Sequence, residues 1–466
     1  MAILSDITTT PLSGLTHIDA LLDTGPDWNY LTGNPANTLY YTFNTQHASA
    51  TANAEITGGV QAFSASQQTY ARGAMAYLSK VTGIQFVETS LATAAQVHFV
   101  NANVLDAGAA GETSWKASYT ADGNGILNNY DADAIIYLDN AQYAADNADL
   151  APAGYGYETL LHELGHMLGL KHPFEGSIRL PEQYDTTAYT LMSYTYDNYI
   201  RSEFSEFDID ALDWLYGGDG LRGSNGLNST GGIRLTGDYG DNTINGGARP
   251  DILQGGFGND VLTAFGGDDA LVGGAGNDVL AAGAGSDLVL YGGLRSDYTI
   301  TRQGSAYVVN DLLGWDGTDT LTDVERIRFA DKTVSFATDA LGSAAYRLYQ
   351  AAFNRAPDEP GLGFWIDKLE HGWSLTSVAA GFMNSLEFAS TYGSNNPAND
   401  VFVTRLYNNV LHREPEAAGF AHWMTQLANG VSKAEVLIGF SESAENQAAL
   451  IGVLSKGFDY VPYTAA

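Results

Sequence analysis

The stretch "LLHELGHMLGLKH" at residues 160–172 places three histidines and a glutamate within eleven positions. His162 and His166 are four residues apart, so a helix carries both on one face, where they can grip a single ion. Leucines at most of the other positions predict that this helix is buried. Gly169 can end the helix with a positive φ and turn the chain back, so that His172 reaches the same ion.

Three histidine ligands leave one coordination position open, which is typical of a catalytic zinc site. Glu163, beside the first ligand, can then abstract a proton from zinc-activated water. With nine histidines in 466 residues, this spacing is expected by chance roughly 0.003 times per chain. That rarity disfavours the alternative of structural histidines in a buried helix. The segment "TLMSY" (190–194) follows, and it fits the methionine turn found in one class of such sites.

Composition limits the classes of protein that remain. A chain of 466 residues is long enough for several domains, and 45% hydrophobic residues exclude wholesale disorder. The formal net charge of −33 argues against nucleic acid or an anionic membrane as a partner. No stretch approaches the ~18 consecutive apolar residues of a membrane span. The chain has no cysteine, which excludes disulfides and thiolate metal sites.

The first 216 or so residues have the pattern of a mixed α/β domain. Ser64 and Gln67 form a capping-box pattern that begins a helix, and Gly83 ends it. A second helix is expected near the end of this region, at 206–218. Three segments rich in β-forming residues are expected to be strands: 38–45, 95–103 and 133–140.

Residues 237–290 divide into six glycine-rich nonapeptides whose eighth residue is always Ile, Leu or Val. This pattern is typical of calcium-binding parallel β-rolls, in which glycines permit tight turns and the apolar residue faces a thin core. A flexible Gly/Asp linker is the alternative, but a linker has no reason to keep a nine-residue register. After Asn242 in the first copy, the sixth position supplies the predicted calcium ligands: Asp251, Asp260, Asp269, Asp278 and Asp287. Aspartates 18 residues apart should lie on the same edge.

Two further regions follow the nonapeptides. Residues 296–336 alternate in the manner of strands and are expected to cap the open end of the roll. Beyond them, a second repeat with an offset of 58 residues pairs Trp365 with Trp423. We expect two or three short helices in each 58-residue unit, with these tryptophans as core anchors rather than ligand platforms.

The extended zinc motif with Pro173 after its last histidine, the methionine turn and the repeats resemble serralysin-type metzincin metalloproteases over residues 36–336. The resemblance implies that one catalytic Zn²⁺ is bound by His162, His166 and His172, with Glu163 as general base. It also implies that Met192 forms an apolar floor under the metal. Tyr194 would be an additional zinc ligand that swings aside to hydrogen-bond the tetrahedral intermediate.

These patterns predict a multidomain chain. An N-terminal extension or short propeptide (1–35) precedes an α/β metzincin catalytic domain (36–218). A parallel β-roll solenoid holding several structural Ca²⁺ ions (219–295) and its β cap (296–340) follow. An all-α domain of two 58-residue repeats (341–466) ends the chain. These repeats resemble a helical domain of unknown function that occurs in bacterial extracellular proteins.

The function expected from the resemblance is a secreted zinc endopeptidase that cleaves proteins or peptides and is stabilised by calcium. It implies export by bacterial type I secretion machinery, to an extracellular or cell-surface location. Substrate would lie extended along the strand near 111–119. The alternative is a surface-associated or glycan-binding protein that binds its partner through the C-terminal domain, with a protease domain that is inactive or only self-processing.

Overall fold

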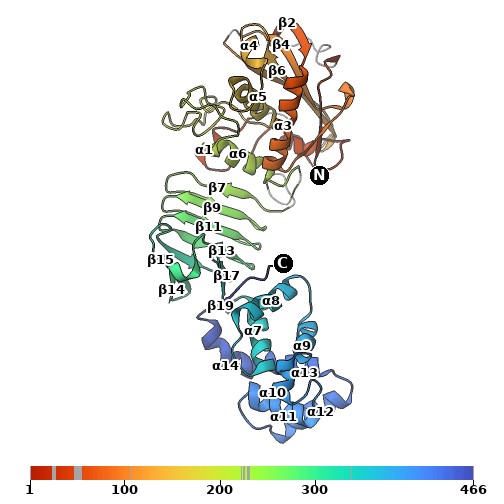
Figure 1. Ribbon diagram of the computed structural model, residues 1–466, viewed down its shortest axis with the longest axis vertical. Coiled ribbons are helices and arrows are strands. Elements are labelled where there is room, and N and C mark those ends of the chain that lie inside the picture. Colours follow the sequence, from red (N-terminus) through yellow and green to blue (C-terminus); the bar gives the residue numbers. More distant parts are fainter. Residues whose placement is uncertain are drawn as a thin grey trace. The chain divides into compact units, whose positions relative to one another are not determined.

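The computed structural model describes residues 2–23, 28–46, 55–106, 108–221, 223, 226–227, 231–336 and 338–464. Parts of every predicted domain therefore lie outside the described residues, among them 24–27 and 228–230. The chain divides into two compact units, Met1–Gln254 and Gly255–Ala466. Figure 1 labels helices and strands of both units.

The first unit is built on a six-stranded mixed sheet in the order β3-β1-β4-β6-β5, with β2 paired to β4. Strands β3, β1, β4 and β6 run parallel to their neighbours, whereas β5 is antiparallel to β6 and β2 to β4. Strand β5 is the last in the order, so one of its edges pairs with no other described strand. The strands are β1 (Thr38–Thr42), β2 (Ile56–Ala62), β3 (Gln85–Glu88), β4 (Val97–Val104), β5 (Gly111–Ala121) and β6 (Leu127–Asp139).

Two long helices of this unit begin and end where the sequence predicts. Helix α3 (Ala65–Thr82) starts at Ser64, whose side chain accepts from the backbone N–H of Gln67, and it ends at Gly83 with φ +74°. Helix α6 (Glu206–Tyr216) ends at Gly217. Shorter helical segments complete the unit: Leu4–Ile7, α1 (Thr16–Asp19), Trp28–Tyr30, Ala92–Ala94 and α4 (Ala144–Asn147).

Helix α5 (Tyr155–Met167) carries the histidine motif and contacts β5 and β6 of the sheet. Leu160, Leu161 and Leu164 are fully buried, as their positions in the sequence predict. Gly169 follows the helix with φ +96°, a conformation that glycine adopts without a steric penalty. The chain therefore reverses direction just before His172.

Short parallel strands follow, and they repeat every nine residues. In the first unit, β7 (Arg234–Thr236) pairs with residues 252–254, the first part of β9 (Ile252–Phe257), and β8 (Thr243–Asn245) lies between the two strands in sequence. In the second unit, β10 (Val261–Thr263) pairs with β12 (Val279–Ala281), and β11 (Ala270–Ala275) with β13 (Leu288–Leu290). Paired residues are 18 apart, for example Leu262 and Leu280. The eighth residue of every nonapeptide is buried: Ile244, Leu253, Leu262, Leu271, Leu280 and Val289.

The next strands continue both ladders of the second unit. Leu321 pairs with Leu280 and Ile327 with Val289, so a further apolar layer follows the last nonapeptides. Strands β14 and β15 add an antiparallel hairpin beside β16. The strands are β14 (Tyr298–Gln303), β15 (Ala306–Asp311), β16 (Thr318–Thr322), β17 (Arg326–Arg328), β18 (Thr333–Ser335) and β19 (Phe458–Tyr460).

The remainder of the second unit is helical and internally repeated. Each 58-residue repeat holds four helices, so the prediction of two or three helices in each repeat is wrong. The additional break falls at Ser385, whose side chain accepts from the N–H of Phe388 and starts a new helix. The helices are α7 (Ala340–Phe353), α8 (Glu359–Glu370), α9 (Leu375–Met383), α10 (Leu386–Tyr392), α11 (Asn399–Val410), α12 (Ala417–Ala428), α13 (Lys433–Ser441) and α14 (Ala444–Leu454).

The two repeated tryptophans pack in the same way. Trp365 and Trp423 are partly buried against the helical core, as predicted for core anchors. A Cβ atom at Gly381 would lie 2.6 Å from the Trp365 ring, and one at Gly439 would lie 2.4 Å from the Trp423 ring. Glycine at these positions therefore makes room for the indoles.

The predicted fold class is confirmed at the level of mixed α/β sheets, parallel strands in the middle of the chain and a helical C-terminal region. Among the described residues, no helix combines the length and the hydrophobicity that a membrane crossing requires.

Candidate metal centre and active-site cleft

The structure brings His162, His166 and His172 together. The Nε2 atom of His172 lies 3.2 Å from Nε2 of His162 and 3.2 Å from Nε2 of His166. Helix α5 supplies the first two side chains from one face, and the reversal at Gly169 returns the third to it. All three imidazoles remain partly exposed, so an ion and a substrate could reach them.

The other ring nitrogens are held by oxygen acceptors. Nδ1 of His162 lies 2.8 Å from the carbonyl O of Leu191, and Nδ1 of His166 lies 2.8 Å from the carbonyl O of Leu170. Nδ1 of His172 lies 2.9 Å from Oε1 of Glu175. A carbonyl oxygen can only accept a hydrogen bond, so His162 and His166 carry their proton on Nδ1. Their Nε2 atoms then carry lone pairs, and both of these atoms lie close to Nε2 of His172.

Facing lone pairs without a cation repel, so this donor set fits a metal ion that prefers imidazole nitrogen. Burial lowers the pKa of His162 well below its usual value, with the charge of His166 as a further cause. Burial, and then the neighbouring His172, lower the pKa of His166 to about 4. Both rings are therefore neutral at pH 7, which is the form that binds metal.

Glu163 lies beside the first histidine and is only 4% exposed. Burial raises the pKa of Glu163 to about 8, and a hydrogen bond from Thr113 acts in the opposite direction. Oγ1 of Thr113 lies 2.7 Å from Oε2 of Glu163. A cation held by the adjacent imidazoles would favour the ionised carboxylate and would lower the pKa of Glu163 from this raised value.

The predicted methionine turn packs against helix α5. Met192 is fully buried, and a Cβ atom at Gly165 of α5 would lie 2.6 Å from its sulfur. The ring of Tyr194 is exposed and lies with its centroid 4.6 Å from that of His172 and 5.9 Å from that of His162. The turn thus places Met192 against the helix and Tyr194 beside the imidazoles.

An aspartate that the sequence analysis did not single out anchors this turn. Asp208 of α6 accepts hydrogen bonds from the Thr190 hydroxyl at 2.6 Å, the Leu191 N–H at 2.7 Å and the Ser205 N–H at 3.0 Å. Burial raises the pKa of Asp208 to about 7. Its position three residues after Ser205 is a capping pattern, which predicts the helix start but not the contact with the turn.

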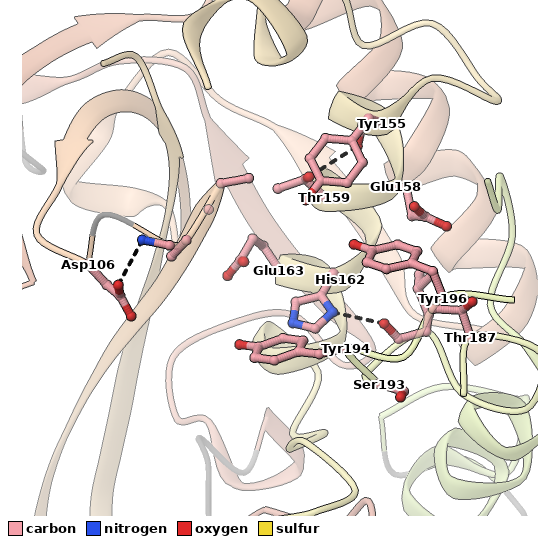
Figure 2. Close-up of a pocket in the computed structure, with 15 residues that line it drawn as sticks. Asp106, Tyr155, Glu158, Thr159, His162, Glu163, Thr187, Ser193, Tyr194 and Tyr196 are labelled. Atoms are coloured by element: carbon pink, nitrogen blue, oxygen red, sulfur yellow. Dashed lines mark hydrogen bonds between the residues drawn. The ribbon is translucent and has the colours of Figure 1, made fainter. Parts of the chain in front are cut away.

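Two cavities share His162 and Glu163 in their linings. One has a volume of about 300 Å³ and continues along Gly108–Gly111, Tyr155, Glu158 and the 191–196 segment. The other, of about 200 Å³, is lined by all three histidines and by Glu112, Thr113 and Glu175. Figure 2 shows His162 and Glu163 extending from α5 at the larger cavity, with Tyr194 beside His162. The imidazoles are therefore at the floor of a cleft that can hold a ligand.

The five repeat aspartates are buried at the turns between short strands. Oδ1 of Asp278 accepts from the N–H of Asp260 at 2.8 Å, and Oδ1 of Asp287 accepts from the N–H of Asp269 at 2.8 Å. In the first unit, Oδ1 of Asp251 accepts from the N–H of Ile233 at 2.7 Å, again across 18 residues. The spacing in the structure is the one that the nonapeptide register predicts.

The second oxygens of Asp278 and Asp287 accept no hydrogen bond within the described part of the chain. Buried carboxylate oxygens without donors fit a hard cation such as Ca²⁺. Asp319 and Glu325 continue the two columns, because their carboxylates accept from the N–H groups of Asp278 and Asp287 at 2.9 and 3.0 Å. The sequence analysis missed both, since they lie 41 and 38 residues away instead of 18.

Comparison with known families identifies two repeated segments. Residues 236–269 and 263–293 match the RTX calcium-binding nonapeptide repeat. Residues 343–392 and 379–450 match a domain of unknown function, DUF4214. The predicted resemblances of both repeat regions are thereby confirmed.

Curated relatives match part of the chain. The metallopeptidase AprA of Pseudomonas marginalis is 31% identical over 199 residues, which is 41% of this chain and 40% of the relative. A serralysin of Photorhabdus laumondii is 28% identical over 176 residues, 34% of each chain. The metalloprotease AprA of Pseudomonas entomophila is 29% identical over 219 residues, 43% of each chain. The similarity to serralysin-type metalloproteases is therefore confirmed, and it spans less than half the length of these relatives.

Proposed function

We propose that this protein is a secreted zinc endopeptidase of the serralysin type. The observation that carries the proposal is the set of three Nε2 atoms, with two distances of 3.2 Å, beside the buried Glu163 in an open cleft. The metalloprotease names of the partial relatives support it. The domains are assigned as a metzincin catalytic domain (36–218), a calcium-binding β-roll (219–295), its cap (296–340) and a helical domain (341–466).

His162, His166 and His172 would hold one Zn²⁺, with Tyr194 as an additional ligand that moves aside. When bound, zinc supplies Lewis-acid chemistry, which polarises the peptide carbonyl and acidifies water. Met192, which is fully buried against the helix, provides the apolar floor below the imidazoles. The oxygen atoms that hydrogen-bond to the Nδ1 atoms fix the orientation of the three rings.

Glu163 acts as general base and then as general acid. Its carboxylate takes a proton from the attacking water and delivers it to the amine that leaves when the peptide bond breaks. The two cavities that share Glu163 in their linings give water and a peptide access to this side chain. The hydroxyl of Tyr194 is assigned to hydrogen-bond the oxyanion of the tetrahedral intermediate.

The substrate peptide binds in an extended conformation along β5, within residues 111–119. Strand β5 ends the sheet, so the N–H and C=O groups on its outer edge can pair with an added strand. The cleft next to that edge offers a cavity of about 300 Å³ for a side chain that flanks the cleaved bond.

Calcium is assigned to the repeat turns, with Asp251, Asp260, Asp269, Asp278 and Asp287 as charged ligands. At submicromolar Ca²⁺ these buried carboxylates repel one another and destabilise the roll, whereas millimolar Ca²⁺ outside the cell stabilises the folded roll. This dependence suits a chain exported unfolded by type I secretion machinery. The location that follows is extracellular or at the cell surface.

Digestion of casein by the full-length protein tests the proposal. Wild type with Ca²⁺ should cleave casein, a zinc chelator should stop cleavage, and added Zn²⁺ should restore it. Glu163→Gln should lower the rate by about 10³-fold or more while zinc content stays at that of wild type. Undiminished cleavage by Glu163→Gln would reject the mechanism. A zinc-loaded wild-type protein that cleaves neither casein nor itself would favour the alternative of an inactive, surface-associated protein.

A further inference from the structure

Two positions on the edge strand β5 contact the side chain of Glu163. They are Gly111 and Thr113, which lie two residues apart and therefore on the same side of the strand. Glu163 lies about fifty residues later, on the helix that packs against this strand. The contacts thus join the helix that carries the histidines to the outermost strand of the sheet.

Gly111 makes room for the carboxylate. A Cβ atom at this position would lie 2.7 Å from Cγ and 2.8 Å from Oε1 of Glu163, which is closer than real Cβ contacts come. The φ angle of Gly111 is outside the left-handed region, so its backbone does not require glycine. The lack of a side chain at Gly111 therefore leaves room for the carboxylate of Glu163.

Thr113 supplies the hydrogen bond that orients the same carboxylate. Its Oγ1 lies 2.7 Å from Oε2 of Glu163 and 2.9 Å from the backbone carbonyl O of Glu163. Within the described part of the chain, no other side chain hydrogen-bonds to this carboxylate. A glutamate side chain has three rotatable torsions, so a single fixed contact near its end strongly restricts it.

We infer that Thr113 and Gly111 are positioning residues for Glu163: the Thr113 hydroxyl holds Oε2, and Gly111 leaves the space in which Oε1 is presented as the proton acceptor. The inference rests on the proposed function, because a base needs positioning only if it acts. Displacement of a reacting group by about 1 Å can cost 10²-fold in rate. Neither residue needs to touch the substrate for this effect.

The test compares Thr113→Val, which keeps the shape and removes the hydroxyl, with Thr113→Ser, which keeps the hydroxyl. Thr120→Val is the matched control, since Thr120 lies on the same strand, is exposed and lines neither of the two cavities. Full-length, zinc-loaded proteins are assayed in Ca²⁺ on a fluorescence-quenched peptide that wild type cleaves. Zinc content and melting temperature are recorded for each variant.

We expect Thr113→Val to lower kcat about 10- to 100-fold with KM within about twofold of wild type. Thr113→Ser should recover kcat to within about threefold, and Thr120→Val should match wild type. Gly111→Ala, as a second variant, should lower kcat in the same way because its Cβ displaces the carboxylate.

The inference is overturned if Thr113→Val keeps wild-type kcat, or if Thr113→Ser is as slow as Thr113→Val. In the second case the shape of the side chain and not its hydroxyl matters. A loss of zinc or of folding in Thr113→Val, with full activity in Gly111→Ala, would also overturn it. These results leave the proposed function intact, because wild type still cleaves. A zinc-loaded wild type that cleaves no peptide rejects the proposed function and the inference together.

Discussion

The carbonyl oxygen of Leu191 lies 2.8 Å from Nδ1 of His162, so the turn that precedes Met192 orients the first imidazole of the cluster. The N–H of the same Leu191 donates to Asp208 at 2.7 Å. A chain of contacts therefore runs from Asp208 on α6 through the turn to His162 on α5. The orientation of His162 therefore depends on residues outside the histidine cluster.

Asp208→Asn should weaken zinc binding without removing a ligand. Asparagine keeps one acceptor oxygen and has an NH2 group in place of the other, so at least one of the Thr190, Leu191 and Ser205 donors loses its acceptor in a buried site. We expect about 10- to 100-fold weaker zinc affinity in a competition titration with a chromophoric chelator. The exposed Asp146→Asn is the control, and equal affinities for the two variants would refute the anchoring role of Asp208.

Tyr194→Phe separates the tyrosine hydroxyl from its ring. The ring lies 4.6 Å from that of His172, so phenylalanine preserves this packing. Loss of one hydrogen bond to the oxyanion should lower kcat by about 10- to 100-fold, with zinc content unchanged because the three imidazoles remain. Steady-state kinetics with metal analysis measures both, and an unaltered kcat would remove Tyr194 from the mechanism.

Asp319→Asn should change how the stability of the second unit depends on pH. Burial raises the pKa of Asp319 to about 7, so in the absence of Ca²⁺ the folded state retains a proton that the unfolded state releases near pH 4. Folding then takes up a proton between these values, and the free energy of unfolding must fall as pH rises through this window.

Urea unfolding in a calcium chelator at pH 5, 6, 7 and 8 measures this fall. The decrease in the free energy of unfolding from pH 5 to pH 8 should be larger in wild type than in Asp319→Asn by at least about 1 kcal/mol. The variant lacks this contribution because asparagine cannot ionise. Asparagine retains an acceptor for the N–H of Asp278, so the ladder persists. Identical pH profiles for the two proteins would show that Asp319 is not protonated in the calcium-free fold.

Gly381→Ala and Gly439→Ala should both destabilise the helical region. Alanine favours a helix over glycine by about 1 kcal/mol, but the new Cβ would lie 2.6 or 2.4 Å from a tryptophan ring. Overpacking costs about 1–3 kcal/mol, so the net effect should be a loss of stability.

Gly452→Ala is the matched control for these two changes. Gly452 also lies within a helix, α14, and its Cβ would meet nothing within 4 Å. This variant should gain about 0.5–1 kcal/mol, as thermal unfolding would show. A gain in stability for all three variants would contradict the packing of the tryptophans.

Local patterns predicted many of the elements, but not strands β2 and β3, the fourth helix of each C-terminal repeat, or all of the contacts between elements. Ser64, Gln67 and Gly83 mark the ends of α3 in the sequence, because capping acts within a few residues. The helical spacing of His162 and His166 likewise places two rings on one face. The nine-residue register predicts which residues are buried, since each strand repeats the one 18 residues earlier.

Contacts across the fold have no such local signal. Thr113 and Glu163 are 50 residues apart, and only the packing of α5 on β5 joins them. The capping pattern at Ser205 and Asp208 predicts the start of α6. It carries no information about the second contact of Asp208, with the methionine turn. Asp319 and Glu325 extend the aspartate columns outside the nonapeptide register.

Metal analysis of the purified full-length protein, with His166→Ala beside wild type, tests the three-imidazole zinc site most directly. Our account predicts about one Zn²⁺ per wild-type chain after dialysis against metal-free buffer containing Ca²⁺, and a loss of nearly all of it in the variant. Folding of both proteins is confirmed by their circular dichroism. Equal zinc in the two proteins, or none in a folded wild type that is offered zinc, would contradict it.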